Sequence, residues 1–342
     1  MNIPHHVRIS GPVFVSAFTL GKTNIILFGD EHFKKTGLCR SCKKDVNCLY
    51  VNDFIENLKN PLDIFVESQW KNDANEKFTS LPPEDVISNV INKYGDNMYH
   101  HKQQYNGRRV HYVDVRNDNT LYGFLMILLS LILKSESNPL HNKVKAPFEL
   151  LQRFSKTQDF KDFANILVES DDFNKAILKK FGKTWSQYFI GKDNLTNIPG
   201  SHLRTINRIR KQILKLSVSN RDALLKFHKD RCKEIVITTK VYNDINDNSK
   251  YSTDEKEFII FDTILLWMSH IMDMYTLARM LHYMNNNYES HSVVVYAGAH
   301  HTENYSTFFS RYLHATAIEY QSYDNKRCVT LPAFFTQKVC KS

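Results

Sequence analysis

Four short, largely apolar runs that each end in ionisable residues constrain the fold of this chain most strongly. They cover residues 25–28, 63–66, 109–113 and 292–296. The first is continuously apolar instead of alternating, which is typical of a strand covered by helices on both faces of a sheet. The carboxyl ends of parallel strands meet at one edge of a sheet. The sequence therefore predicts a single crevice lined by the residues that follow these runs.

The order of the runs predicts an α/β fold. Helical spacing over residues 51–58 and 258–284 alternates with the strands, as in right-handed crossovers of a parallel sheet. The alternating segment 13–19, followed by a turn and residues 25–28, indicates an antiparallel edge hairpin. We expect a mainly parallel sheet with helices on both faces, this edge hairpin, and a large helical insertion.

The insertion sets the expected domain organisation. Residues 1–118 form the N-terminal α/β half of the core, residues 119–256 a helical insertion or cap, and residues 257–342 the C-terminal half of the same sheet. The most apolar run, 121–133, is shorter than the roughly 20 residues that span a bilayer, so we interpret it as a buried helix. The polar stretch 243–257 predicts a loop.

Composition bears on compartment and partners. Residues 1–10 lack the apolar stretch of a secretory signal, which predicts a cytoplasmic protein whose six cysteines are reduced thiols. The frequent use of Asn, Lys, Ile and Tyr is similar to that of large DNA viruses, for which the compartment would be the host cytoplasm or the virion.

The formal net charge of +9 favours an acidic partner. The excess of basic residues is concentrated between Arg204 and Lys233, which could contact nucleic acid or a membrane surface. No motif with aromatic stacking positions accompanies it. A solvated helix face is therefore the favoured interpretation, and nucleic-acid binding remains the alternative.

Histidines and a carboxylate follow three of the strands. His32 comes three residues after Gly29, His300 and His301 follow Gly298, and Glu67 directly follows the run 63–66. We attribute to the glycines a tight turn that aims the imidazole over the sheet. Imidazoles and a carboxylate can bind a metal ion or move protons near neutral pH, or they can simply cap helices.

Two further groups are candidates with open alternatives. Asp114 could add a ligand to the crevice or form a local salt bridge with Arg116. The cysteines Cys39, Cys42 and Cys48 could hold structural zinc, although no second C-x-x-C completes the set. Free thiols or a disulfide account for them equally well.

Together, the first G-x-x-H, the strand-ending Glu67 and the second G-x-x-H resemble the TraB/TIKI and ChaN/erythromycin-esterase-like superfamily. The resemblance covers about residues 25–116 and 258–301. In that superfamily an Arg lies on the helix before the last motif, and Arg279 occupies the matching place. The resemblance implies a fold like that of ChaN and the erythromycin esterases.

The resemblance also implies a hydrolase acting on an ester or peptide bond of a small molecule or peptide. In this interpretation His32, Glu67 and His301 hold a divalent metal ion or activate water. Glu31 is similar to the Glu near the catalytic His of the esterase branch, and Arg279 orients a carboxylate or stabilises an oxyanion. His300 and Asp114 are the additional cofactor-binding candidates.

Three alternatives remain open. A ChaN-like protein would bind haem or a metal without turnover. A structural or nucleic-acid-associated protein would carry the crevice as a relic. For Arg279 itself, a structural ion pair with Asp114 or Asp273 competes with a contact to Glu67 or Glu31.

Overall fold

The computed structural model describes residues 6–31, 48–59, 61–67, 107–114, 213–247, 253–284, 291–323 and 328–332. Helices and sheets with parallel strands are both present, so the predicted α/β class is confirmed. The chain divides into two compact units. One comprises Met1–Asp114 with Met280–Ser342, and the other Val115–Arg279. The domain boundaries expected from the sequence stay a prediction.

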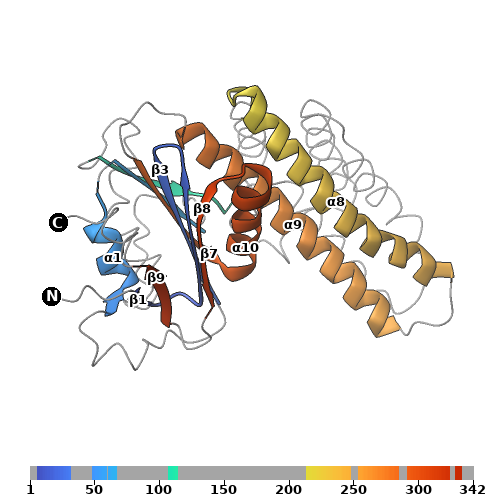
Figure 1. The fold of residues 1–342 in the computed structure, drawn as a ribbon. Helices are drawn as coiled ribbons and strands as arrows, with labels where there is room; N and C mark the ends of the chain where they lie inside the picture. Colours follow the sequence, from blue (N-terminus) through green and yellow to red (C-terminus); the bar gives the residue numbers. More distant parts are fainter. Residues whose placement is uncertain are drawn as a thin grey trace, which may run out of the picture. The chain divides into compact units, whose positions relative to one another are not determined.

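A six-stranded sheet forms the centre of the first unit (Figure 1). Its order is β6 (Arg108–Tyr112), β5 (Leu62–Val66), β7 (His291–Gly298), β3 (Thr23–Asp30), β2 (Phe14–Leu20) and β8 (Thr316–Tyr323). The four strands from β6 to β3 are mutually parallel, whereas β2 pairs antiparallel with both β3 and β8. The late strand β7 is therefore hydrogen-bonded between two early ones.

The two central strands are buried along their whole length. Every residue of β3 and of β7 is buried. Their aliphatic side chains, such as Ile26 and Val294, are 0% exposed. Complete burial of one such side chain contributes about 1.5–3 kcal/mol, so continuous apolar runs stabilise these strands in the middle of the sheet.

Helices cover both faces of this sheet (Figure 1). Helix α1 (Val51–Asn57) buries Val51, Phe54 and Ile55 at helical spacing. The Phe54 ring packs edge-on against Phe28 of β3, with 5.7 Å between centroids. Helix α10 (Ala299–Thr307) lies over the next residue of β3, Gly29. Successive strand residues point to opposite faces, so α1 and α10 cover opposite faces.

A second, three-stranded sheet was not expected from the sequence. Its order is β4 (Cys48–Tyr50), β1 (His6–Ser10) and β9 (Cys328–Pro332), with β1 parallel to β4 and antiparallel to β9. Ile9, Val329 and Leu331 share a core with α1 and the large sheet. Strands of three to five residues carry too short a pattern to be recognised in sequence.

The prediction that the cysteines are reduced thiols is wrong for Cys48 and Cys328, which are disulfide-bonded. It rested on the absence of a secretory signal, which says nothing about whether two sulfurs lie within bonding distance. Cys48 consequently has no thiolate to offer a zinc ion, and Cys39 and Cys42 lie outside the described residues. Cys232 is a free cysteine.

The remaining elements belong to the chain after residue 212. Helix α8 (Val218–Asp247) and helix α9 (Thr253–Met284) extend into the stretch 243–257, so the loop predicted there is too long. A short π-helix, η4 (Phe308–Tyr312), follows α10 and leads through His314, whose φ is +48°, into β8. The buried helix predicted over 121–133 lies outside the described residues. Within the described part of the chain, no helix meets the length and hydropathy needed to cross a membrane.

A buried carboxylate joins three parallel strands. Asp63 of β5 is 0% exposed and accepts two hydrogen bonds of 2.6 Å from the Arg109 guanidinium of β6. Its oxygens also lie 2.7 Å from His111 Nε2 of β6 and 2.6 Å from His291 Nε2 of β7. Burial alone would raise the pKa of Asp63. The hydrogen bonds from the two histidines and Arg109, with the charge of His111, hold it well below its ordinary value.

Gly29 is required by a close approach and not by a turn, which corrects the reason given for the first motif. It lies inside β3, and a Cβ there would come 2.5 Å from Thr302 Oγ1 and 2.8 Å from the Cα of Ala299. Its φ is not positive, and neither is that of Gly298. Only glycine lets the first turn of α10 pack this closely on the strand.

We expect Asp63→Asn to lower the free energy of unfolding by about 3–5 kcal/mol at pH 7, because it removes the buried carboxylate that Arg109, His111 and His291 share. A carboxyl whose folded pKa is depressed stabilises the fold above its unfolded pKa of about 3.9, and this contribution disappears as pH falls toward the folded pKa. Urea unfolding from pH 7 to pH 3 should therefore show the two proteins converging below about pH 4. A constant difference at every pH would contradict the assignment.

Gly29→Ala should destabilise the fold by about 1–3 kcal/mol through overpacking. The variant Gly29→Ala/Thr302→Ala removes the nearer clash but keeps the backbone one, so we expect partial recovery. Gly21→Ala is the comparison for backbone strain alone, because Gly21 has a φ of +57° and a Cβ added there would meet no atom within 4 Å. Thermal unfolding of the four proteins measures these differences. Equal stability of Gly29→Ala and the parent would show that α10 is not packed as described.

Candidate functional site

Glu67 and His301 meet at the carboxyl edge of the large sheet. Glu67 directly follows β5, and its backbone N–H donates to the carbonyl of Tyr296 in β7 at 3.0 Å. Its side-chain Oε2 accepts a 2.6 Å hydrogen bond from the backbone N–H of Gly298. Its other oxygen, Oε1, lies 3.8 Å from His301 Nε2. Both side chains are buried, so this pair is shielded from bulk water.

The position of the carboxylate follows from helix α10. Gly298 is the N-cap of that helix, where backbone N–H groups lack partners within the helix. The helix dipole places partial positive charge at the same end and stabilises a carboxylate there. Glu67 thus accepts a hydrogen bond from the helix start, and its negative charge compensates the partial positive charge there. This hydrogen bond orients the carboxylate.

The two adjacent histidines point to different surroundings. His301 is buried, and its ring stacks on that of Tyr305 one helical turn later, with centroids 6.4 Å apart. His300 is exposed, and its ring lies 6.2 Å from that of His301 in an edge-on arrangement. Of the pair, His301 is the imidazole next to Glu67, in agreement with the G-x-x-H spacing.

The other strand ends contribute carboxylates along the same edge. Asp30, which the sequence reasoning did not select, is the last residue of β3 and pairs in register with Gly298. Glu31 follows it and is partly exposed. Asp114 is 9% exposed and lies two residues beyond the end of β6. β6 is separated from β7 by β5, so Asp114 lies at a more distant position along the edge.

Two predicted members of the site are not placed beside this pair. His32 lies outside the described residues. Arg279 donates a 2.8 Å hydrogen bond from Nη1 to the hydroxyl of Tyr275, one turn earlier on α9. Arg279 belongs to the second unit and Glu67 to the first, so the contact expected between them stays a prediction.

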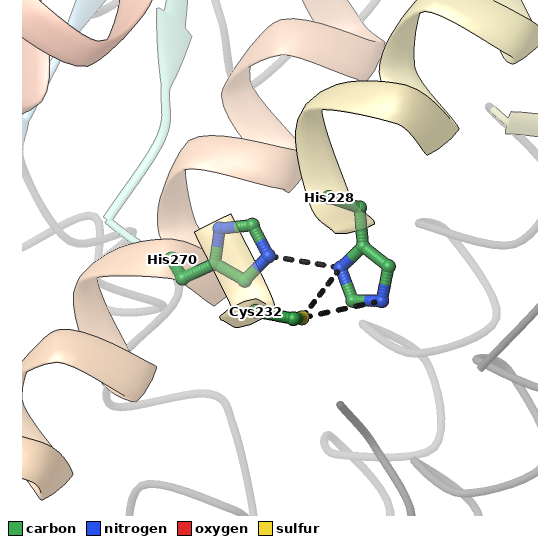
Figure 2. Close-up of side chains that lie close together, drawn as sticks. All are labelled: His228, Cys232 and His270. Carbon is green, nitrogen blue, oxygen red and sulfur yellow. Dashed lines mark hydrogen bonds between the residues drawn. The ribbon is translucent and has the colours of Figure 1, made fainter. Parts of the chain in front are cut away.

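The second unit contains a group that sequence reasoning missed (Figure 2). His228 and Cys232 lie one turn apart on α8, and His270 comes from α9. All three side chains are buried, and their potential ligand atoms lie within 4.8 Å of one another. This group could hold a metal ion. The spacing H-x-x-x-C on one helix is the signal that could have identified it, but His and Cys in an apolar stripe resemble core positions.

Burial dominates the electrostatics of this group. It raises the pKa of the Cys232 thiol to about 12, against a smaller opposing effect of the nearby Arg231 charge. The pKa of His270 lies well below its ordinary value because of burial and the charges of His228 and Arg231. Without a metal ion, the sulfur is therefore a thiol and the His270 ring is neutral.

The chain matches no protein-family model, and no curated protein or solved structure matches it either. The resemblance to the TraB/TIKI and ChaN/erythromycin-esterase-like superfamily therefore rests on the motifs alone and remains a prediction.

We predict that Cys232 reacts with thiol-alkylating reagents only when the protein unfolds. A buried thiol with a pKa near 12 has little thiolate at pH 8, and thiolate is the reactive form. Mass-spectrometric mapping of the Cys232 peptide after alkylation, with and without denaturant, measures this. Rapid modification of Cys232 in the native protein would contradict the described burial.

Proposed function

We propose that this chain is a hydrolase of the TraB/TIKI and erythromycin-esterase type, with Glu67 and His301 as its acid–base pair. The observation that carries the proposal is their juxtaposition, 3.8 Å apart and buried, at the carboxyl edge of parallel strands. Such edges are the usual ligand sites of open α/β sheets. The substrate class is an ester or amide of a small molecule or peptide.

The proposed chemistry assigns a separate role to each group. His301 acts as general base and takes a proton from the attacking water. The Glu67 carboxylate accepts the Gly298 N–H at the start of α10, where the helix dipole favours negative charge, and it offsets the charge of the imidazolium that forms. The water oxygen then bonds to the carbonyl carbon, whose C=O π electrons move to the oxygen to give a tetrahedral oxyanion. When this intermediate collapses, the bond from carbon to the leaving oxygen or nitrogen breaks, and the imidazolium gives its proton to that leaving group.

The two groups are 3.8 Å apart, beyond direct hydrogen-bonding distance. In this proposal a water molecule or a divalent metal ion bound beside the pair bridges them. His32 is the further ligand in the metal-assisted form of this proposal. Asp30 is the last residue of the neighbouring strand β3, and Glu31 follows it. Arg279 is proposed to stabilise the oxyanion.

The position of the pair in the topology supports a ligand site. The connection from β3 to β5 carries α1 on one face, and the connection from β7 to β8 carries α10 on the other. Adjacent strands whose connections leave toward opposite faces create a crevice at their carboxyl ends. β3 and β7 are adjacent strands of this kind. Glu31 and His301 follow these two strands, and Glu67 follows the neighbouring β5.

The test compares Glu67→Gln and His301→Ala with Glu303→Gln on a panel of ester and peptide substrates. Glu303 lies on the exposed side of α10 and is a charge-matched control on the same helix. We expect the two site variants to lose about 10²–10⁴-fold in kcat/KM, as when a general base is removed, and Glu303→Gln to retain activity. Circular dichroism and thermal unfolding check that each variant is folded.

Full activity in His301→Ala would refute the assignment. Absence of hydrolysis by the parent protein across the whole panel, together with haem or metal retained after purification and lost in His301→Ala, would instead support the ChaN-like binding alternative.

A further inference from the structure

Three metal-ligating side chains converge inside the second unit, and none of them has a role in the proposed hydrolysis. Among the described residues, His228, Cys232 and His270 are the group that can reach one ion together. Residues four apart on a helix share one face, so α8 presents His228 and Cys232 side by side. The third ligand comes from α9, a separate helix (Figure 2).

The separations between the ligand atoms are close to those of a metal complex. Cys232 Sγ lies 3.6 Å from His228 Nδ1, and His228 Nδ1 lies 2.9 Å from His270 Nε2. With ordinary bond lengths, a trigonal complex has nitrogen and sulfur about 3.7 Å apart and two nitrogens about 3.5 Å apart. The nitrogen–sulfur separation matches such a complex, whereas the two hydrogen-bonded nitrogens would have to move about 0.6 Å apart to bind the same ion.

The three side chains are shielded from bulk water. His228 and Cys232 are each 1% exposed and His270 is 0% exposed. Leu224 and Phe227 continue the same buried face of α8, and the Phe227 ring centroid lies 6.0 Å from that of His270. Polar groups in such a place are ordinarily satisfied by a specific partner. A metal ion would engage two imidazoles and a sulfur at once.

The donor set and the charge together indicate which metal. Thiolate is a soft ligand that favours Cu⁺ and Zn²⁺, and imidazole suits both ions. One thiolate and two neutral imidazoles compensate a single positive charge, so Cu⁺ gives a neutral complex and Zn²⁺ leaves one positive charge. A net charge is costly in a buried site. The charge balance therefore favours the monovalent ion, Cu⁺.

We propose that His228, Cys232 and His270 bind one thiophilic metal ion and that the site prefers Cu⁺ to Zn²⁺. On binding, the Cys232 thiol loses its proton to the solvent and its sulfur bonds to the metal, and metal–nitrogen bonds replace the hydrogen bond between the two imidazoles. No electron transfer is involved, since copper enters and stays as Cu⁺. Because the ligands tie α8 to α9, the bound ion also stabilises this pair of helices.

The experiment titrates the full chain anaerobically with Cu⁺ against a chromophoric Cu⁺ chelator, and in parallel with Zn²⁺ against a zinc chelator. The variants are Cys232→Ser and His270→Gln. We expect each variant to lose one high-affinity Cu⁺ equivalent, with an affinity loss exceeding the roughly 10- to 100-fold cost of changing an outer-shell partner. X-ray absorption at the copper edge should show one sulfur and two nitrogen donors in the parent protein.

His314→Asn is the matched control for binding by an exposed histidine. His314 has a φ of +48°, and Asn tolerates that conformation, so the substitution removes an imidazole with little strain. This control should keep the full Cu⁺ stoichiometry. Added Cu⁺ should raise the unfolding temperature of the parent and of the control, but not that of Cys232→Ser, which guards against a variant that simply fails to fold.

Each result decides part of the proposal. Equal Cu⁺ stoichiometry and affinity in the parent and Cys232→Ser would overturn the site altogether. Loss of a Zn²⁺ equivalent in the variants, with tighter binding of Zn²⁺ than of Cu⁺ by the parent, would overturn the preference for the monovalent ion.

Discussion

The attachment of β7 to β5 is the constraint on which the large sheet depends. At the amino end, Asp63 bonds to His291, the first residue of β7, and also to Arg109 and His111 of β6. At the carboxyl end, Glu67 accepts the N–H of Gly298, the last residue of β7. Two carboxylates, one within β5 and one directly after it, therefore hold both ends of the neighbouring strand. A one-residue slip would break both connections and turn every buried side chain to the other face.

This double attachment also determines what lies at the candidate site. Because β7 is held in register, α10 begins beside Glu67. The absence of a side chain at Gly29 lets the first turn of α10 pack directly on β3. The carboxylate is oriented by a backbone donor instead of a flexible side chain, so its geometry survives changes elsewhere on the surface. His301 is carried to the same place by the first turn of the helix. The site is thus a product of the sheet register, built on rigid elements.

Sequence reasoning located the strand ends because fully buried strands carry uninterrupted apolar runs, and this brought Glu67 and His301 together as candidates. It could not place β7 between β3 and β5, since strand order depends on long-range packing that no local pattern records. The partners of Asp63 were missed for the same reason. His228, Cys232 and His270 were missed for a different reason. Histidine and cysteine also occur at ordinary core positions, and only the pairing of two helices brings these three residues together. The disulfide-bonded state of Cys48 and Cys328 contradicts an inference drawn from composition alone.

The late position of β7 in the chain has a consequence for how the protein is made. Asp63 and His291 are 228 residues apart in sequence, yet they bond directly. While the chain emerges from the ribosome, β3 and β5 are complete long before the strand that lies between them, and both expose unpaired edges rich in Ile, Phe and Val. To close the sheet, β7 must then pair with strands that are very distant in sequence, and the formation of such long-range contacts is slow. The nascent protein therefore passes through a period in which its most apolar strands are available to other chains.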